Sequence, residues 1–272
     1  MNKKPFKLKL DKLEVEQKYK EFGTMLKVAK YYKANPCTMA RFFRRNNINY
    51  KNKHKNTFNE EFFSIDSPES FYLAGFIAAD GNISNKKNRI NIELGEKDKE
   101  FLQKILLLIN YHGNLKLSII KNSKRNENWK DTISYKLIFS SQKTVSDLKK
   151  FNIVPAKTKI YDFPDWLINH KFVNHFMRGY FDGDGHIGIR NNKKLRWHLA
   201  GNYSFLCKFQ SILEKNCCIH HNKIMIRPNG LACLEYQGNI ITTKICNFLY
   251  NNSTFHLDRK YNMYINWYNT NA

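Results

Sequence analysis

The sequence repeats itself, and this repetition limits its possible folds more than any other feature. Five pairs of identical residues recur at one spacing of 104 positions: Asp80 and Asp184, Gly81 and Gly185, Ile83 and Ile187, Phe101 and Phe205, and Leu102 and Leu206. An offset that persists from a short motif into a segment about twenty residues later indicates duplication of one structural unit. We therefore expect two similar halves in this part of the chain.

Each half predicts the same order of elements. A helix is expected over 67–81, because Ser67 suits the N-cap and Pro68 the first helical turn. Apolar and polar residues then alternate, which predicts a hairpin with one buried and one polar face. The two hairpins are expected to reverse near 85–88 and 191–194. A helix, two more strands and a basic amphipathic helix complete each half, so we predict an α+β fold of two pseudo-symmetric αββαββα repeats.

The charge balance points to a polyanionic partner. The 272 residues include 46 Lys and Arg but 23 Asp and Glu, a formal net charge of +23. Such a surplus repels itself in a compact fold, and nucleic acid relieves the repulsion because phosphates supply the opposite charge. A coding bias toward Lys and Asn is the alternative, but it does not explain the scarcity of acids.

Cysteine usage and hydropathy predict an intracellular protein. The six cysteines include no C-x-x-C pair, and no apolar run approaches the length of a membrane span. We expect reduced thiols and a location in the cytoplasm of a bacterium or phage-infected cell, or in an organelle.

Residues 1–57 differ from the repeats and predict a small all-α domain. Helices are expected over 13–23, 24–35 and 36–48, followed by a polar, basic linker over 51–59. The last two helices resemble a helix-turn-helix DNA-binding unit. Its outward residues are Thr38, Arg41, Arg44 and Arg45. A basic helical hairpin that only packs on the main domain is the alternative.

Two helices carry matching stripes of small residues. Gly75 and Ala79 are four residues apart, as are Gly179 and Gly183, and small residues at this spacing let two helices pack backbone to backbone. Each helix ends in Asp-Gly, so this packing would bring Asp80 next to Asp184. A divalent cation such as Mg²⁺ would offset their repulsion and could assist hydrolysis of a phosphodiester. Asp182 is expected to project elsewhere and to serve the helix end.

The segments "YLAGFIAADGNI" and "FMRGYFDGDGHI" resemble the signature helices of LAGLIDADG homing endonucleases in their single-chain form. The resemblance covers roughly 60–272, with motifs at 70–83 and 174–187, and implies repeats over 58–161 and 162–272 that form a DNA-binding saddle. It implies metal binding by Asp80 and Asp184, joined by the backbone carbonyls of Ala79 and Gly183. It also implies catalytic lysines late in each repeat, at Lys157 in "FNIVPAKTK" and Lys260 in "HLDRKY".

The polar faces of the predicted sheets supply candidate DNA-binding residues. In the first repeat these are Asn82, Ser84, Arg89, Asn91, Lys116 and Lys136; in the second they are His186, Arg190, Arg196, His198, Lys223 and Arg227. Such side chains read base edges in the major groove.

These features predict a monomeric, Mg²⁺-dependent homing endonuclease, intron-encoded or free-standing. The enzyme would cut both strands at a long asymmetric site, and the resemblance implies 3′ overhangs. Two other functions stay open: a maturase that assists RNA splicing on the same fold, and a non-catalytic helix-turn-helix regulator. Retention of both acids argues against each.

Overall fold

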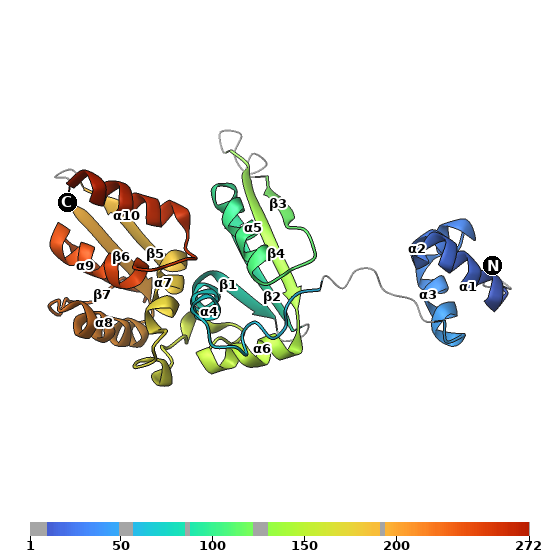
Figure 1. The fold of residues 1–272 in the computed structure, drawn as a ribbon, viewed down its shortest axis with the longest axis horizontal. Coiled ribbons are helices and arrows are strands. Elements are labelled where there is room, and N and C mark those ends of the chain that lie inside the picture. Colours follow the sequence, from blue (N-terminus) through green and yellow to red (C-terminus); the bar gives the residue numbers. More distant parts are fainter. Residues whose placement is uncertain (1–9, 49–56, 85–87, 122–129, 191–193, 272) are drawn as a thin grey trace. The chain divides into compact units, whose positions relative to one another are not determined.

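The structure, a computed structural model, describes residues 10–48, 57–84, 88–121, 130–190 and 194–271. The chain divides into two compact units, Met1–Asn56 and Thr57–Ala272, which are treated separately below (Figure 1). Most of the expected hairpin turns at 85–88 and 191–194, and most of the linker over 51–59, lie outside the described residues. Within the described parts, no helix has the length and apolar character needed to cross a membrane.

The first unit is a three-helix domain. Its helices are α1 (Lys12–Phe22), α2 (Met25–Tyr31) and α3 (Pro36–Arg45). Side chains of Asp11, Thr24 and Asn35 accept hydrogen bonds from the first turns and so fix the three starts. Val15, Val28, Met39 and Phe43 form its buried centre. The predicted all-α character is confirmed.

The second unit contains the two repeats. The first consists of α4 (Pro68–Asp80), β1 (Gly81–Ser84), β2 (Arg89–Gly95), α5 (Lys99–Leu108), β3 (Lys116–Ile120), β4 (Thr132–Ser140) and α6 (Gln142–Leu148). The second consists of α7 (Val173–Asp184), β5 (Gly185–Ile189), β6 (Leu195–Gly201), α8 (Tyr203–Cys217), β7 (Met225–Ile226), β8 (Ala232–Gln237) and α9 (Asn239–Tyr250). Short 3₁₀ turns lie at Glu96–Asp98, Lys149–Phe151, Lys157–Lys159 and Asp165–Leu167. The αββαββα order is confirmed twice.

Two details differ from the prediction. The second repeat continues into a further helix, α10 (Asp258–Asn271). The closing helices are less basic than expected: α6 holds one Lys and one Asp, Lys143 and Asp147, and α9 holds one Lys, Lys244, and no acid. Apolar contacts stabilise both helices in the fold, because Val145 and Leu148 of α6 and Ile245 and Leu249 of α9 are buried.

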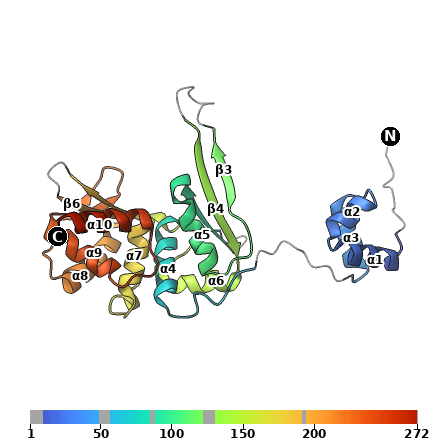
Figure 2. The same cartoon turned by 45° about the horizontal axis from the view of Figure 1, so that its top comes forward.

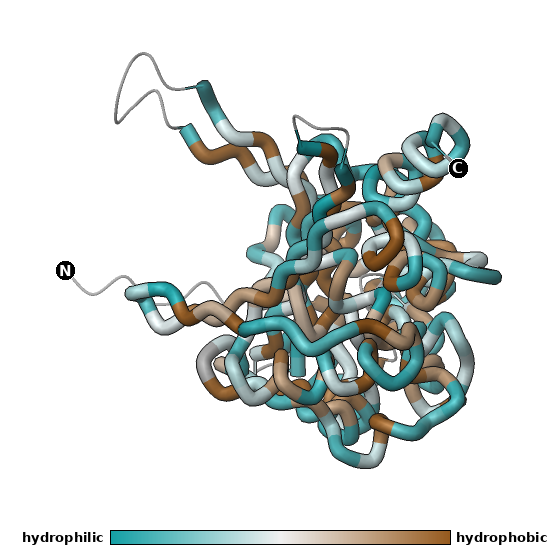
Figure 3. Tube along the Cα trace, turned by 90° about the vertical axis from the view of Figure 1, so that its left-hand side faces the viewer, coloured by the Kyte–Doolittle hydropathy of each residue, from teal (hydrophilic) through white to brown (hydrophobic). Residues whose placement is uncertain are grey.

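Both sheets are antiparallel and share one strand order, β1-β2-β4-β3 and β5-β6-β8-β7. Register places Ile90 opposite Phe139 and Ile92 opposite Leu137, so one face of the first sheet is apolar and buried. Helices α8, α9 and α10 cover one face of the second sheet (Figure 1, Figure 2). Hydrophobic and hydrophilic residues follow one another along the strands (Figure 3). Buried residues alternate with less buried ones in β2 and β6, so the opposite face of each sheet carries the polar side chains.

Helices α4 and α7 join the repeats through a contact that only glycine permits. A Cβ on Gly75 would lie 2.0 Å from the carbonyl oxygen of Phe176, and one on Gly179 would lie 1.9 Å from that of Tyr72. Both distances are far below van der Waals contact. The predicted backbone-to-backbone packing of the two small-residue stripes is therefore confirmed.

Gly179→Ala tests this contact. The added methyl forces the helices apart, so we expect the free energy of unfolding to fall by about 3 kcal/mol in urea titration, the range of an overpacked core. Gly95→Ala is the matched control, because a Cβ there meets no atom within 4 Å. Equal stability of the two variants would contradict the packing described.

Candidate active site

The two signature helices deliver their final residues to one place. Strand β1 begins directly after Asp80 and β5 directly after Asp184, so each acid is fixed between a helix end and a strand start. A Cβ built on Gly183 would lie 2.4 Å from Ala79 Cβ and 3.4 Å from Asp80 Oδ2. The last turns of α4 and α7 therefore touch, and Asp80 lies against the end of α7.

The paired carboxylates are electrostatically unfavourable. Both reach solvent, but protein surrounds much of each group, and this partial burial is the largest cause of their raised pKa values. Repulsion by Asp80 adds to the effect at Asp184, whose pKa rises to about 6, while Lys157 and Lys260 oppose it. The four charged groups predicted to act together do lie within electrostatic reach of one another.

Both predicted lysines are buried and bound to backbone carbonyls. Lys157 Nζ donates to Gly81 O at 2.6 Å. Lys260 Nζ donates to Phe181 O (2.8 Å), Asp182 O (2.7 Å) and Gly183 O (3.2 Å), and to Gly185 O. Burial lowers the pKa of both ammonium groups, that of Lys260 to about 8. Each lysine thus closes the carboxyl end of its own signature helix, where carbonyls lack partners.

Tyr180 also belongs to the site, although the sequence analysis did not predict it. Its hydroxyl forms a hydrogen bond with Asp184, and its ring stacks on Tyr161 at 6.0 Å between centroids. The residue 104 positions earlier is Phe76, which cannot form this bond. Comparison of the repeats position by position would have singled out this difference. The two carboxylates therefore have unequal surroundings.

The available donors fit a hard divalent cation. Mg²⁺ is typically held by one or two carboxylates, with waters and phosphate oxygens completing its shell. Asp80 and Asp184 offer accessible oxygens, and a cation would relieve their repulsion. Over the described ranges, no group of three or more His, Cys, Asp and Glu side chains could hold a metal. The Gly183 carbonyl already accepts from Lys260, so a cation bound to this oxygen would share it.

On the first sheet, the predicted DNA-binding residues share one face. Asn82 pairs with Asn91, and Lys116 pairs with Lys136, which is opposite Glu93. Ser84 and Arg89 also pair and close the β1–β2 ladder. Arg89 Nε and Asn91 Oδ1 are buried atoms without a hydrogen-bond partner in the described structure.

On the second sheet, the predicted residues also gather on the polar face. His186 pairs with His198 on the neighbouring strand. Arg196 lies two residues before His198, on the same face of β6, and Arg190 follows β5 directly. Lys223 and Arg227 lie in exposed segments beside the short strand β7 rather than within a long one. In the separate N-terminal unit, Thr38, Arg41, Arg44 and Arg45 are all exposed.

Acids on these basic faces were not singled out from the sequence. Glu235 on β8 binds Arg196 through a short ion pair, and Arg190 lies 3.8 Å away. Glu93 accepts from Lys136 at 3.0 Å and from Ser134 at 2.6 Å. Each sheet thus holds basic side chains on an internal carboxylate, which orders them before any partner arrives.

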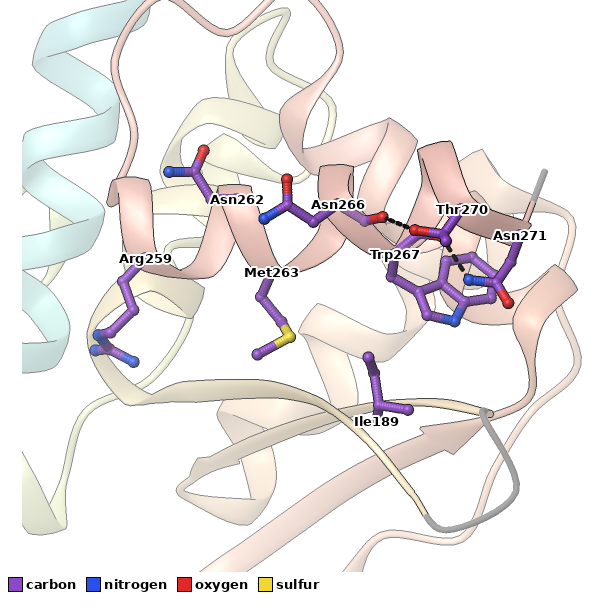
Figure 4. A pocket seen from close by; sticks show the side chains of 8 residues that line it. All are labelled: Ile189, Arg259, Asn262, Met263, Asn266, Trp267, Thr270 and Asn271. Atoms are coloured by element: carbon purple, nitrogen blue, oxygen red, sulfur yellow. Dashed lines mark hydrogen bonds between the residues drawn. The ribbon is translucent and has the colours of Figure 1, made fainter.

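A groove of about 530 Å³ lies between α10 and β5, away from the carboxylate pair (Figure 4). Met263 projects from α10 toward Ile189 on β5, and Arg259 lies at its start (Figure 4). None of the four charged groups of the site lines this groove. Asp80 and Asp184 are both exposed at the ends of their helices.

Comparison with known proteins agrees with the geometry. Residues 67–152 match the family model of a LAGLIDADG-like domain. No curated protein matches the chain.

Solved structures extend the similarity to both repeats. The homing endonuclease I-WcaI bound to its DNA recognition sequence is 14% identical, with a TM-score of 0.54 over 74% of this chain and 90% of that one. This likeness confirms the two-repeat LAGLIDADG fold. Weaker likenesses are to the meganuclease I-SmaMI bound to uncleaveable DNA (14% identical, TM-score 0.48, covering 75% and 89%) and to full-length DUF199/WhiA from Thermatoga maritima (16% identical, TM-score 0.44, covering 78% and 70%).

Asp184→Asn should stabilise the metal-free protein near neutral pH. The pKa of Asp184 is about 6 in the folded protein and about 4 in the unfolded chain. The folded protein therefore loses stability as the pH rises from about 4 through about 6, because the unfolded chain gives up this proton more readily. The neutral amide avoids this loss, and we expect a gain of roughly 1 kcal/mol after allowing for solvent screening.

Urea titrations in EDTA near neutral pH and at about pH 4, where the gain should vanish, measure this effect. Asp165→Asn is the control, because this exposed carboxylate pairs with Lys208 at 2.7 Å and its loss should give no stabilisation. An Asp184→Asn protein less stable than wild type near neutral pH would contradict the electrostatic description.

Proposed function

We propose that this protein is a site-specific DNA endonuclease that hydrolyses both strands with the help of a divalent cation. The observation that carries the proposal is the meeting of Asp80 and Asp184 at the touching ends of α4 and α7. Two adjacent carboxylates repel each other, and a bound cation would offset this repulsion. The net charge of +23 and the polar sheet faces support DNA as the substrate. The likeness in fold to I-WcaI, a homing endonuclease solved on DNA, agrees with this proposal.

The site residues would act on a scissile phosphate from fixed positions. Asp80 and Asp184 would hold Mg²⁺, with Ala79 and Gly183 carbonyls at the same contact. The ion, when bound, supplies polarisation of the phosphate and a more acidic water. Tyr180 orients the Asp184 carboxylate. Lys157 and Lys260 hold the helix ends in place and provide positive charge beside the developing phosphate charge.

Base recognition would fall to the polar faces of the two sheets. The faces carry different side chains: Lys, Asn and Ser dominate the first, whereas Arg and His dominate the second. Two unlike faces predict a long asymmetric target and a protein that acts as a monomer. A family-type cut would leave 3′ overhangs.

The N-terminal unit would extend the contact with DNA. Lys33, between α2 and α3, has a left-handed φ of 48°, the conformation that a tight interhelical turn uses. Four exposed residues of α3, Thr38, Arg41, Arg44 and Arg45, suit groove and phosphate contacts. We propose that this unit is a helix-turn-helix module, which would lengthen the recognised site.

Cleavage of a randomised pool of duplex DNA tests the proposed function. With Mg²⁺, the protein should cut one long sequence in both strands, and EDTA should stop the reaction. Asp80→Asn and Asp184→Asn should each lower the cleavage rate by roughly a hundredfold or more and leave binding intact, because the amide cannot replace a charged metal ligand. Asp165→Asn, on a surface away from the site, should cut as wild type does.

Two results would refute the nuclease proposal. A wild-type protein that binds a defined duplex but never cuts it would behave as a regulator, the alternative function. Unchanged cleavage by Asp184→Asn would show that the chemistry lies elsewhere.

Glu235→Gln should relax base preference in one half of the target. Arg196 is the side chain best suited to bidentate contact with guanine, and Glu235 holds it in place. We expect discrimination at the position read by Arg196 to fall roughly tenfold, measured by sequencing selected duplexes. Glu93→Gln on the first sheet is the matched control and should alter only the other half. Loss of preference spread evenly over both halves would contradict this assignment.

A further inference from the structure

A buried polar cluster lies beneath α7 and has no counterpart in the first repeat. Asp182 is 1% exposed and accepts three hydrogen bonds, from Tyr72 (2.7 Å), Tyr250 (2.6 Å) and the backbone N–H of Leu257 (2.8 Å). The residue 104 positions before Asp182 is Ala78. A buried carboxylate is tolerated only when such donors satisfy it. The duplication therefore diverged here into an anchor with three partners.

Arg178, one turn earlier on α7, holds the same segment of chain. It is also 1% exposed and donates to Leu249 O at 2.9 Å and Phe255 O at 3.2 Å. At the corresponding position the first repeat has Ala74. Arg178 and Asp182 together fix the connection between α9 and α10 from its beginning to its end.

This connection determines where Lys260 lies. The N–H of Lys260 donates to Leu257 O at 3.0 Å, so the first turn of α10 is built on the residue that Asp182 binds. Lys260 Nζ then returns to the carbonyl of Asp182 at 2.7 Å. Asp182 thus contacts the α9–α10 connection through its side chain and Lys260 through its backbone carbonyl. The start of α10 is also held from the first repeat, because Arg259 binds Asp98 through two hydrogen bonds of 3.1 and 3.2 Å.

Among the residues that the structure describes, Lys157 is held by fewer contacts than Lys260. It donates to one carbonyl, that of Gly81, and its 3₁₀ turn begins after Ala156, which has a left-handed φ of 56° and makes no side-chain cap. An ammonium group that several acceptors already hold loses less conformational freedom when charge develops on a nearby phosphate. Lys260 is therefore better preorganised than Lys157.

We propose that Asp182 is a positioning residue that sets Lys260 in place and makes the two halves of the site unequal, so that one DNA strand is cut faster than the other. This inference rests on the proposed endonuclease function. The contacts support it: among the described residues, Lys260 Nζ donates to four carbonyls around the end of α7, whereas Lys157 Nζ donates to one carbonyl at the end of α4. Loss of one lysine's position should therefore weaken one half of the pair.

Single-turnover cleavage of a selected duplex, with a different label on each strand, tests the inference. Wild type with Mg²⁺ should accumulate a nicked product with the same strand cut first each time. Asp182→Asn presents an amide N–H₂ among donors and should slow one strand at least tenfold, with the other within threefold. Lys260→Met should slow the same strand, and the double variant should add little to either single one. Tyr250→Phe is the matched control: it removes one hydrogen bond to Asp182 but keeps the Leu257 contact, so both strands should stay within threefold.

The outcomes separate the two claims. Equal slowing of both strands by Asp182→Asn, or a strand bias as large in Tyr250→Phe, would overturn the positioning role and leave the nuclease function standing. A wild-type protein that cuts neither strand would overturn both. Should Asp182→Asn not fold, Lys260→Met and Lys157→Met decide: slowing of different strands, with the Lys260 strand cut first in wild type, supports the proposal, and slowing of the same strand refutes it.

Discussion

The contact between the backbones of α4 and α7 is the constraint on which the rest of the structure depends. Gly75 faces the carbonyl of Phe176 and Gly179 faces that of Tyr72, so the two helices approach as closely as helices can. This approach brings the last turns together, where Ala79, Asp80 and Gly183 meet. Because each helix runs directly into the first strand of its sheet, the same contact sets where both sheets begin. Charge pairing and sheet placement follow from one steric fact.

The two repeats share one scaffold but differ around the proposed catalytic acids. The strand orders of the two repeats are identical, and the acids occupy equivalent positions. Their surroundings differ: Tyr180 stands where the first repeat has Phe76, and the buried residues Arg178 and Asp182 stand where it has two alanines. Duplication supplies two copies of a scaffold, and later substitutions in the interior can adjust each half without changing the fold. The polar sheet faces differ in the same way, as the proposed asymmetric target would require.

Much of this fold could be predicted from the sequence, because its strongest signals are local or repeated. Alternation in "RINIEL" and the Ser67-Pro68 start gave correct elements, and the offset of the repeats gave two equivalent sheets. Small residues four apart predicted the helix contact. Predicting Lys157 and Lys260 beside the carboxylates relied on family resemblance, since spacing alone cannot single out a lysine in so basic a chain.

Other features depend on contacts between distant segments, which no local pattern records. The place of α10 follows from Asp182 and Asp98, each far from it in sequence. The lysine ammonium groups bind backbone carbonyls, which have no sequence signature. Glu235 was overlooked because its partner Arg196 lies on another strand. The closing helices carry little charge because buried apolar residues such as Leu148 and Leu249 hold them in place.

We propose that the contact between α4 and α7 creates a metal site from Asp80 and Asp184. Anomalous diffraction from Mn²⁺ in crystals of the protein with a selected duplex measures this most directly. We predict manganese at the ends of α4 and α7, about 2.1 Å from carboxylate oxygens of both residues, with a phosphate oxygen in its shell. Manganese bound elsewhere, or carboxylates that stay without metal beside the bound DNA, would contradict it.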